Sequence, residues 1–460
     1  MNPRDQILIL GGATHKNRGD RAMHEGLLRW LRQEVPDARP VFLASNPELT
    51  AEVLNVDSRL SPDGLLAQPW TRETPSSTRQ RLEAWWRGMK FALRPPGDFS
   101  EHLSRARAVF VPGSGSMNSL WWHDWLYVKA AEIHAARRAG VPVFMSSQGI
   151  GPVFTHWMDR RVALGMFRRC ARVGVRDDAQ SIDLLTELGL QGSQCLHTGD
   201  DALLIPPDHR PSDRILAGVP KWRQIVGLNV RNSSSYGRRY AKPQPKLWAE
   251  ALRALLEQGV DAHFVFIPIS YDAQDDDRVA ARQVADLMPD AANRITLIEE
   301  ELDAAALRGL ATRCHVAAGI SYHFLLFCLA ASVPTLGVWQ NPYYQQKQGG
   351  LFRLYDIPEA AFDLAALDGN RLKEAIQNLL DQHDSLSDQL RSWNQKLGAR
   401  AREARQTIVG LLGTMPPHTQ SPLHIQGQLD PAPFASTPSA PTTASSARPV
   451  ASSSPWIKSR

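Results

Sequence analysis

A histidine that follows a predicted buried strand is the clearest candidate for acid–base chemistry in this sequence. Residues 314–339 predict a strand, a Gly/Ser turn, an apolar helix and a second strand, and His323 falls in the first turn of that helix. Ser321 stands where its hydroxyl can cap the helix. An imidazole beside the positive end of a helix suits an anionic ligand. The alternative is a capping or core histidine that satisfies a neighbouring carbonyl, and the segment alone leaves both open.

Two glycine-rich loops in the first half could also hold an anion. Residues 11–20 run Gly-Gly-Ala-Thr-His-Lys-Asn-Arg-Gly-Asp between a predicted strand and a helix that Asp20 can cap. The spacing is neither a dinucleotide fingerprint nor a P-loop. Residues 112–116, Pro-Gly-Ser-Gly-Ser, follow a predicted strand at 108–111. Small residues at the carboxyl end of a strand line the crevice where α/β sheets bind ligands.

Three tryptophans, Trp121, Trp122 and Trp125, come directly after the second loop. Their rings could stack on the face of a sugar. They could equally anchor the loop in the core, which is the commoner fate of a tryptophan. The sequence does not separate these two interpretations.

Charged residues close several other predicted strands. Arg176 and Asp177 end a strand at 173–175, and Asp200 and Asp201 follow shortly after it. Arg231 ends a strand at 225–230, where a guanidinium can bind phosphate or carboxylate through two parallel hydrogen bonds. The alternative for Arg231 is a surface ion pair.

The elements that must position these residues alternate between short apolar strands and helices. Such alternation predicts parallel sheets with helices on both faces. It runs through the first half and restarts after the prolines at 206, 207 and 211. We therefore expect an α/β fold of two Rossmann-like domains facing each other across a cleft. The first would span residues 1–205 and the second 206–414, with closing helices at 371–382 and 386–412 that pack back across the joint. Residues 415–460 are rich in Pro, Ser, Thr and Ala and predict a disordered tail.

Residues 71–100 form an insertion with a predicted amphipathic helix. Its apolar positions are Leu82, Trp85, Trp86, Met89 and Leu93, with arginines and a lysine towards the other face. One interpretation is a helix that lies on a membrane surface and reaches a lipid-linked acceptor. The other, which we favour, is a helix that covers the edge of the sheet.

Composition excludes several classes of protein. The 460 residues carry a net charge of only +5, without the clustered basic residues of a nucleic-acid binder. The four cysteines show neither a C-x-x-C motif nor zinc spacing, which favours reduced core thiols. No signal-peptide pattern and no apolar stretch of membrane-spanning length is present. We expect a cytoplasmic protein, in peripheral contact with the inner membrane surface if the insertion binds lipid.

Taken in order, the motifs resemble those of the polysaccharide pyruvyl transferase family over residues 7–355. The matching positions are Asn17, Gly19 and Asp20; Gly113, Ser114 and Gly115; 149–152; Arg176 and Asp177; Asp201; Arg231; His323; and 333–334. The family is similar in architecture to two-domain GT-B glycosyltransferases. Its members transfer the enolpyruvyl carbons of phosphoenolpyruvate to two sugar hydroxyls of a surface polysaccharide and form a cyclic ketal.

The resemblance implies roles for individual residues. His323 would be the catalytic histidine, with a pKa near the working pH, and Arg231 would bind phosphoenolpyruvate. Many members carry Arg-Leu-His where this chain has Ser-Tyr-His at 321–323, so Lys347, or the arginines at 238 and 239, would substitute for the missing charge. The expected donor-binding residues are Asn17, Gly19, Asp20, Gly113, Ser114, Gly115, Ser321 and Lys347. Thr14, Trp121, Trp122 and Trp125 would face the acceptor, and Arg176, Asp177 and Asp201 would maintain the structural motif.

Pyruvyl transfer from phosphoenolpyruvate to a glycan, without metal or redox cofactor, is therefore the predicted function. One alternative is a GT-B glycosyltransferase that uses a nucleotide sugar, which tight binding of a nucleoside diphosphate would indicate. A second is a non-catalytic glycan-binding relative, which would bind a glycan but no donor.

Overall fold

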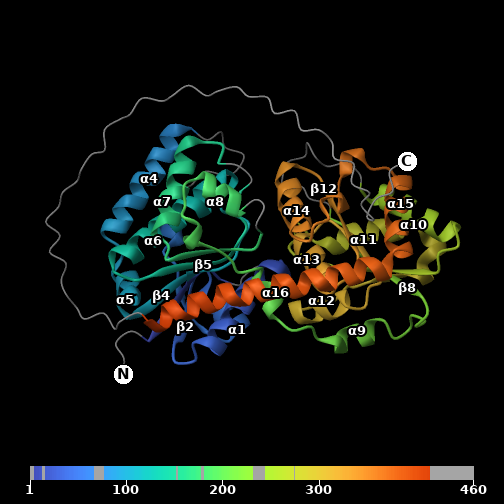
Figure 1. Cartoon of the computed structure of the whole chain (residues 1–460), viewed down its shortest axis with the longest axis horizontal. Coiled ribbons are helices and arrows are strands. Elements are labelled where there is room, and N and C mark those ends of the chain that lie inside the picture. Colours follow the sequence, from blue (N-terminus) through green and yellow to red (C-terminus); the bar gives the residue numbers. More distant parts are fainter. Residues whose placement is uncertain are drawn as a thin grey trace.

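The computed structural model describes residues 5–12, 16–66, 77–151, 154–177, 181–231, 244–273 and 275–414. Two α/β units lie beside each other (Figure 1), each built on one parallel sheet. The predicted two-domain fold is confirmed. The predicted tail at 415–460 lies outside the described residues.

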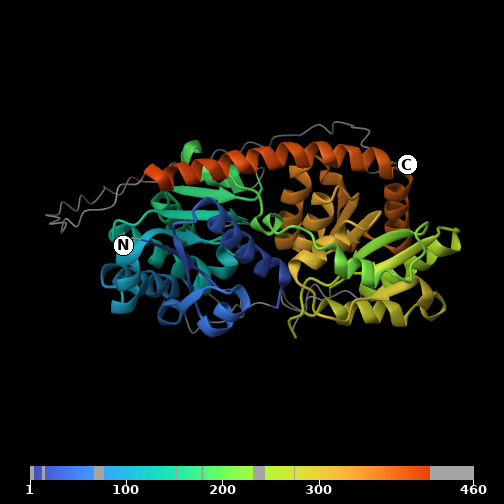
Figure 2. The ribbon, with the colours of Figure 1, turned by 90° about the horizontal axis from the view of Figure 1, so that it is seen from below.

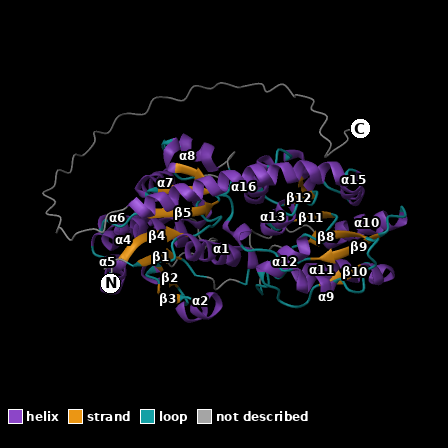
Figure 3. Ribbon diagram, turned by 60° about the horizontal axis from the view of Figure 1, so that its bottom comes forward, coloured by secondary structure: helices purple, strands orange, loops and turns teal. Residues whose placement is uncertain are grey.

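The first sheet has seven parallel strands in the order β3-β2-β1-β4-β5-β6-β7. Every residue of β1 is buried, and odd and even positions pack into different cores. Ile7 and Ile9 face the helix α1 (Arg18–Glu34), and Leu8 and Leu10 face the helices on the other side. Helices therefore cover both faces, as the purple and orange layers of Figure 3 show. The strands are β1 (Gln6–Leu10), β2 (Arg39–Ala44), β3 (Asp57–Leu60), β4 (Ala106–Val111), β5 (Val143–Gln148), β6 (Arg172–Val175) and β7 (Cys195–His197).

The helices of this unit are α1 (Arg18–Glu34), α2 (Pro47–Leu54), α3 (Asp63–Leu66), α4 (Thr78–Leu93), α5 (Gly97–Arg105), α6 (Tyr127–Arg138), α7 (Trp157–Arg169) and α8 (Asp183–Glu187). Gly140 follows α6 with a φ of 71°, which confirms the glycine predicted to close that helix. The start of α1 differs from the prediction. It begins at Arg18 and is capped by Asn17 rather than Asp20, because the Asn17 side chain reaches the Gly19 and Asp20 N–H groups.

The second sheet has six parallel strands in the order β10-β9-β8-β11-β12-β13. They are β8 (Gln224–Asn229), β9 (Ala262–Phe266), β10 (Ile295–Leu297), β11 (Val316–Gly319), β12 (Thr335–Trp339) and β13 (Ala361–Asp363). The helices are α9 (His209–Ile215), α10 (Gln244–Glu257), α11 (Asp277–Asp286), α12 (Ala304–Ala311), α13 (Tyr322–Ala330), α14 (Pro342–Leu354) and α15 (Gly369–Asp381). In each sheet the strand order reverses direction at one point, between β1 and β4 and between β8 and β11. Ligands of open α/β sheets bind outside the carboxyl ends of the strands at such points.

A long last helix, α16 (His383–Thr414), joins the two units (Figure 2). Leu386 and Leu390 at its start belong to the core of the second unit, whereas Ile408 and Leu412 pack beneath the first sheet with Ile7 and Ile9. The prediction that the closing helices pack back across the joint is confirmed for α16.

The insertion helix α4 does not pack as predicted. It covers the helices α6 and α7 rather than the edge of the sheet, and its buried residues are Arg81, Ala84, Gly88, Phe91 and Ala92. The predicted apolar side chains Leu82, Trp85, Trp86 and Leu93 are instead exposed. The small residues Ala84 and Gly88 explain this choice of face, because they allow α4 to approach α6 closely; a Cβ at Gly88 would lie 3.2 Å from the Ala131 Cβ.

The four cysteines are buried and unpaired, as predicted. Within the described part of the chain, we find no helix with the length and apolar character needed to cross a bilayer.

Candidate active site

Residues 16–18 at the start of α1 contact the second unit. The Arg18 N–H donates to the Ile269 carbonyl at 2.8 Å, and the Tyr271 N–H donates to the Lys16 carbonyl at 3.1 Å. An antiparallel bridge pairs Asn17 with Ser270. The positive end of α1 is therefore fixed against the second unit. Thr14, predicted to face the acceptor, lies outside the described residues.

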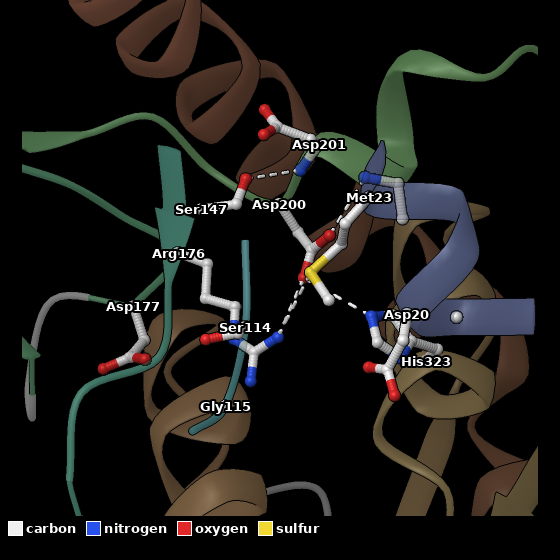
Figure 4. Close-up of polar contacts among 12 residues, drawn as sticks. Asp20, Met23, Ser114, Gly115, Ser147, Arg176, Asp177, Asp200, Asp201 and His323 are labelled. Carbon is white, nitrogen blue, oxygen red and sulfur yellow. Dashed lines mark hydrogen bonds and ion pairs between the residues drawn. The ribbon is translucent and has the colours of Figure 1, made fainter. Parts of the chain in front are cut away.

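His323 is buried where the two units meet. It lies in the first turn of α13, near Asp20 of α1 (Figure 4). Its ring packs directly against Gly19 at the start of α1. A Cβ at Gly19 would overlap the His323 ring, so only glycine fits this position. Gly19 thus makes room for the histidine. Its donor-binding role stays a prediction.

The protonation of His323 differs from the sequence-based expectation. Burial lowers the pKa of His323 well below 6.5; Asp20 opposes this shift, and Lys347, Arg176 and Arg231 reinforce it. The imidazole is therefore neutral at neutral pH. Its Nε2 lies 3.8 Å from Asp200 Oδ2 and makes no hydrogen bond within the described residues. A neutral, buried imidazole among three cations is suited to accept a proton once an anion has entered.

Asp200 is a site residue that the sequence analysis passed over in favour of its neighbour. Asp200 Oδ2 lies 3.4 Å from Arg176 Nη1 and faces His323 (Figure 4). Asp201 points elsewhere: its carboxylate accepts from Arg405 on α16 at 3.0 Å, which agrees with its predicted structural role. Both aspartates come from the turn after β7, and only the direction of that turn distinguishes them.

Arg176 lies at the centre of the cleft rather than in a purely structural position. It directly follows β6, and its guanidinium stacks 4.1 Å from the Tyr322 ring centroid on α13. Asp177, the other half of that motif, accepts hydrogen bonds from the backbone and side chain of Ser181. Arg176 thus contacts both units, whereas Asp177 holds the local turn.

The two strand-end loops of the first unit surround Arg176. A Cβ at Gly149 would lie 2.7 Å from the Arg176 guanidinium, and one at Gly115 would lie 3.3 Å from it. The Gly149 N–H donates to the Ser114 carbonyl at 2.8 Å, which joins the loops to each other. Gly113 packs against Met23 and Ser147 with no room for a side chain. The glycines therefore allow the backbone to pass close to a buried cation.

Lys347 approaches the same loops from α14 of the second unit. Its Nζ lies 5.2 Å from the Tyr322 ring centroid and 5.7 Å from that of Tyr343. The Tyr343 hydroxyl donates to the Gly115 carbonyl at 3.2 Å across the cleft. Burial lowers the pKa of Lys347 to about 8, and Arg176 adds to this effect. A small pocket is lined by residues of both units: Gly115, Gly149, Ile150, Gly151, Arg176, Asp177, Tyr343, Gln346 and Lys347.

Arg231 is buried and forms no surface ion pair. Its Nε and Nη2 donate to Asp277 at 2.6 and 3.1 Å. Asp277 also accepts from the Asn229 side chain and from the Ile269 and Ser270 N–H groups. This network fixes the Arg231 guanidinium near His323, and its positive charge lowers the pKa of His323. Two nitrogen atoms of the guanidinium already donate hydrogen bonds to Asp277.

Two other predictions need correction. Ser321 precedes α13, but its side chain makes no capping hydrogen bond; its N–H instead donates to Asn229 Oδ1 at 2.9 Å, which sets the course of the turn.

Trp122 is buried against Tyr127 and beneath the Arg81 guanidinium, so it anchors the loop and cannot stack on a sugar. Trp125 is half-buried against the same core, with Lys129 Nζ 4.7 Å from its ring centroid, and Trp121 is also half-buried.

The sequence matches the family model for polysaccharide pyruvyl transferase over residues 17–342, well over half of the chain. The chain belongs to this family. The match includes His323, Arg231, Arg176, the second glycine-rich loop and the end of the first loop from Asn17 onwards, although Lys347 lies just beyond its end. The predicted family is thereby confirmed.

The chain is similar to a curated protein in sequence and to several solved structures in fold. It is 21% identical to the amylovoran biosynthesis protein AmsJ of Erwinia amylovora, over 84% of this chain and 94% of AmsJ. Among solved structures, it resembles UDP-GlcNAc 2-epimerase from Neisseria meningitidis (TM-score 0.55, 11% identity, covering 88% of this chain and 100% of the other). It also resembles a glycosyltransferase from Rickettsia africae (TM-score 0.55, 12% identity, covering 89% and 99%). These two likenesses show the GT-B fold alone. The family match and the similarity to AmsJ together identify the chain as a transferase-family protein of polysaccharide biosynthesis.

Proposed function

We propose that the protein transfers the pyruvyl group of phosphoenolpyruvate to two hydroxyls of a sugar in a surface polysaccharide or its precursor. The products would be a cyclic ketal and inorganic phosphate. The observation that carries the proposal is the neutral, buried His323, which lies in a closed cleft among Arg176, Arg231 and Lys347. Neither a metal nor a redox cofactor enters the scheme.

The charges of the cleft suit a small polyanion. Phosphoenolpyruvate carries a phosphate and a carboxylate, and Arg176, Arg231 and Lys347 supply positive charge from three separate elements. The ends of α1 and α13 add partial positive charge at the same place. Lys347 is our candidate for the arginine that many members carry two residues before the histidine, because it reaches the ring of Tyr322 from the facing helix.

A single histidine can relay the first proton. His323 takes up a proton when the anionic donor enters, and the imidazolium delivers this proton to the methylene carbon, which becomes a methyl group and leaves C2 electrophilic. The oxygen of the first sugar hydroxyl then bonds to C2, and the proton of that hydroxyl passes to the imidazole. Asp200, 3.8 Å from Nε2, and Asp20 stabilise the transient imidazolium. The second hydroxyl then bonds to C2, the C2–O bond to phosphate breaks, and phosphate leaves with the second proton.

Titration calorimetry tests the donor. The purified full chain would be titrated with phosphoenolpyruvate, UDP and GDP in separate experiments, and the same would be done with Arg231→Ala, Lys347→Ala and the surface control Lys396→Ala. We expect saturable binding of phosphoenolpyruvate that weakens by at least about tenfold in the two cleft variants, because each removes a charge-assisted contact. The control should bind as the unmodified chain does.

The chemistry needs a separate measurement. Incubation with phosphoenolpyruvate and a glycan that lacks pyruvyl groups should release phosphate and give a ketal methyl signal by NMR, and His323→Gln should abolish both while still binding the donor. Tight binding of UDP or GDP with none of phosphoenolpyruvate would replace this proposal with a nucleotide-sugar glycosyltransferase. Binding of glycan alone would indicate a non-catalytic relative.

A further inference from the structure

A group of large apolar side chains is exposed on the first unit, away from the cleft. Leu82, Trp85, Trp86 and Leu93 on α4 and Trp157 at the start of α7 have exposed fractions between 42% (Trp85) and 58% (Trp157). We call these five residues the Trp face. Contiguous exposed apolar side chains of this size mark an interaction site in most soluble proteins.

The Trp face borders a groove that is already formed. The groove runs between α4 and α7 above α6 and has a volume of about 400 Å³. Its floor is made of small residues, Gly88, Ala130, Ala131 and Gly165, and its walls include Leu82, Trp85, Met89, Trp157 and Met166. Such a groove, with mostly apolar walls and this volume, can receive part of a hydrocarbon chain.

The helix that carries the Trp face is firmly attached by its other side. Arg81 donates two hydrogen bonds to the buried Asp159 of α7, at 2.8 and 3.1 Å, and the Tyr127 hydroxyl donates to the same carboxylate. Arg81 also lies over the Trp122 ring, 4.6 Å from its centroid. The exposed tryptophans are thus not the result of loose packing, because α4 buries a different face.

Basic side chains predominate on the two helices that form the groove. All residues of α4 and α7 are described, and their exposed charged side chains are basic except for Glu83; the basic ones are Arg79, Arg87, Lys90, Arg160, Arg161, Arg168 and Arg169. Lys90 Nζ lies 5.6 Å from the Trp86 ring centroid, so charge and aromatic surface share one face. The two acidic residues Asp159 and Glu132 nearby are buried in ion pairs.

The chain connects the start of the groove-forming helix α7 to a loop of the cleft. Thr78 at the start of α4 contacts His156 Nε2 at 3.1 Å, and His156 caps α7. That helix follows the loop at 149–151, which lines the cleft pocket.

We propose that the Trp face docks on an anionic phospholipid bilayer. Trp85, Trp86 and Trp157 would lie at the level of the headgroups, the arginines and Lys90 would contact lipid phosphates, and the groove would hold one acyl chain. Tryptophan favours the membrane interface, and basic side chains near an anionic surface add to the binding energy. The partner is a membrane rather than a protein because basic and aromatic side chains are interleaved around an apolar channel.

Vesicle flotation tests this independently of any activity. The full chain would be mixed with vesicles of phosphatidylcholine alone or of phosphatidylcholine with phosphatidylglycerol. We expect binding to the anionic vesicles that is weakened by salt and is at least about tenfold weaker to the neutral ones. The triple variant Trp85→Ser, Trp86→Ser, Trp157→Ser and the variant Arg87→Glu, Lys90→Glu, Arg161→Glu should each lose binding by at least about tenfold.

Matched variants on other surfaces provide the controls. Trp222 is 77% exposed in the second unit, and Arg402 is exposed on α16, so Trp222→Ser and Arg402→Glu should bind anionic vesicles as the unmodified chain does. Thermal melting of each variant verifies that it is folded. Undiminished vesicle binding by both Trp-face variants would overturn the proposal. A second outcome would also overturn it. If no protein binds vesicles, and sedimentation shows that the unmodified chain is a dimer and the Trp-face variants are monomers, the Trp face joins two copies of the chain.

Discussion

At the scale of single residues, burial sets the charges of the two titratable groups that we place nearest the reaction. His323 is neutral because the cleft desolvates it and cations surround it, and Lys347 keeps its charge only up to about pH 8 for the same reasons. Each group is thus shifted towards its neutral form. An incoming anion would reverse both shifts, so binding of the donor and protonation of these side chains are thermodynamically linked.

The pKa of Lys347 predicts a pH limit on donor binding. The ammonium is present below about pH 8 and is lost above it, so the affinity for phosphoenolpyruvate should fall as the pH rises through about 8. Lys347→Arg keeps its charge at any such pH and should bind with an affinity that stays level from pH 7 to 9. Calorimetry at several pH values measures both. An equal fall in the affinity of Lys347→Arg over this pH range would show that Lys347 does not bind the donor.

Gly19 gives a steric prediction. In Gly19→Ala the new Cβ would occupy the position of the His323 ring, which must then rotate away from Asp200. We expect phosphate release to fall by roughly 100-fold, since displacement of a catalytic group by an ångström has this effect. Gly410→Ala on α16 is the control, because a Cβ there meets no neighbouring atom; it should retain full activity and gain up to about 1 kcal/mol of stability. An active Gly19→Ala protein would mean that His323 tolerates displacement.

At the scale of elements, the short turns after strands decide which side chains reach the cleft. The turn after β11 directs His323 inwards, with its course set by the hydrogen bond from the Ser321 N–H to Asn229. The turn after β7 directs Asp200 to the cleft and Asp201 to α16. Helix α4 shows the same dependence, because two small residues and one buried ion pair select its packed face.

The ion pair of Arg81 with Asp159 predicts a large loss of stability on truncation. Arg81→Ala would leave the Asp159 carboxylate buried without its cation, and we expect the free energy of unfolding to fall by about 3–5 kcal/mol. Urea unfolding measures this. Arg79→Ala on the same helix, where the guanidinium is exposed, should change stability by less than about 0.5 kcal/mol. Equal losses in both variants would show that the position in α4, rather than burial of the pair, is responsible.

At the scale of the whole molecule, α16 and the α1 loop hold the two units together. The α1 loop fixes the first unit to residues 269–271, and α16 contributes apolar side chains to both cores. The active site belongs to neither unit alone, because His323, Arg231 and Lys347 come from one unit and Asp200, Arg176 and Gly19 from the other.

Arg405 allows the coupling by α16 to be measured. Arg405→Ala removes the cation that pairs with the buried Asp201, and we expect a loss of about 3–5 kcal/mol from the unfolding free energy of the first unit. The affinity for phosphoenolpyruvate should also fall, because Asp201 adjoins Asp200 in the same turn. Arg402 lies about one helical turn earlier and is exposed, so Arg402→Ala should leave both the unfolding free energy and the donor affinity unchanged. If Arg405→Ala is destabilised but binds the donor with undiminished affinity, the contact of α16 with Asp201 does not influence the donor site.

The sequence by itself determined the alternating strands and helices, the two-unit organisation and the position of His323 after a strand. These depend on local periodicity and on residue types such as glycine, which act over a few positions. Only the tertiary structure decided that Asp200 rather than Asp201 faces His323, that Trp122 is buried while Trp85 and Trp86 are exposed, and that the pKa of His323 falls. Each of these depends on contacts between residues far apart in the chain, because burial and charge in the cleft exist only once the two units have met.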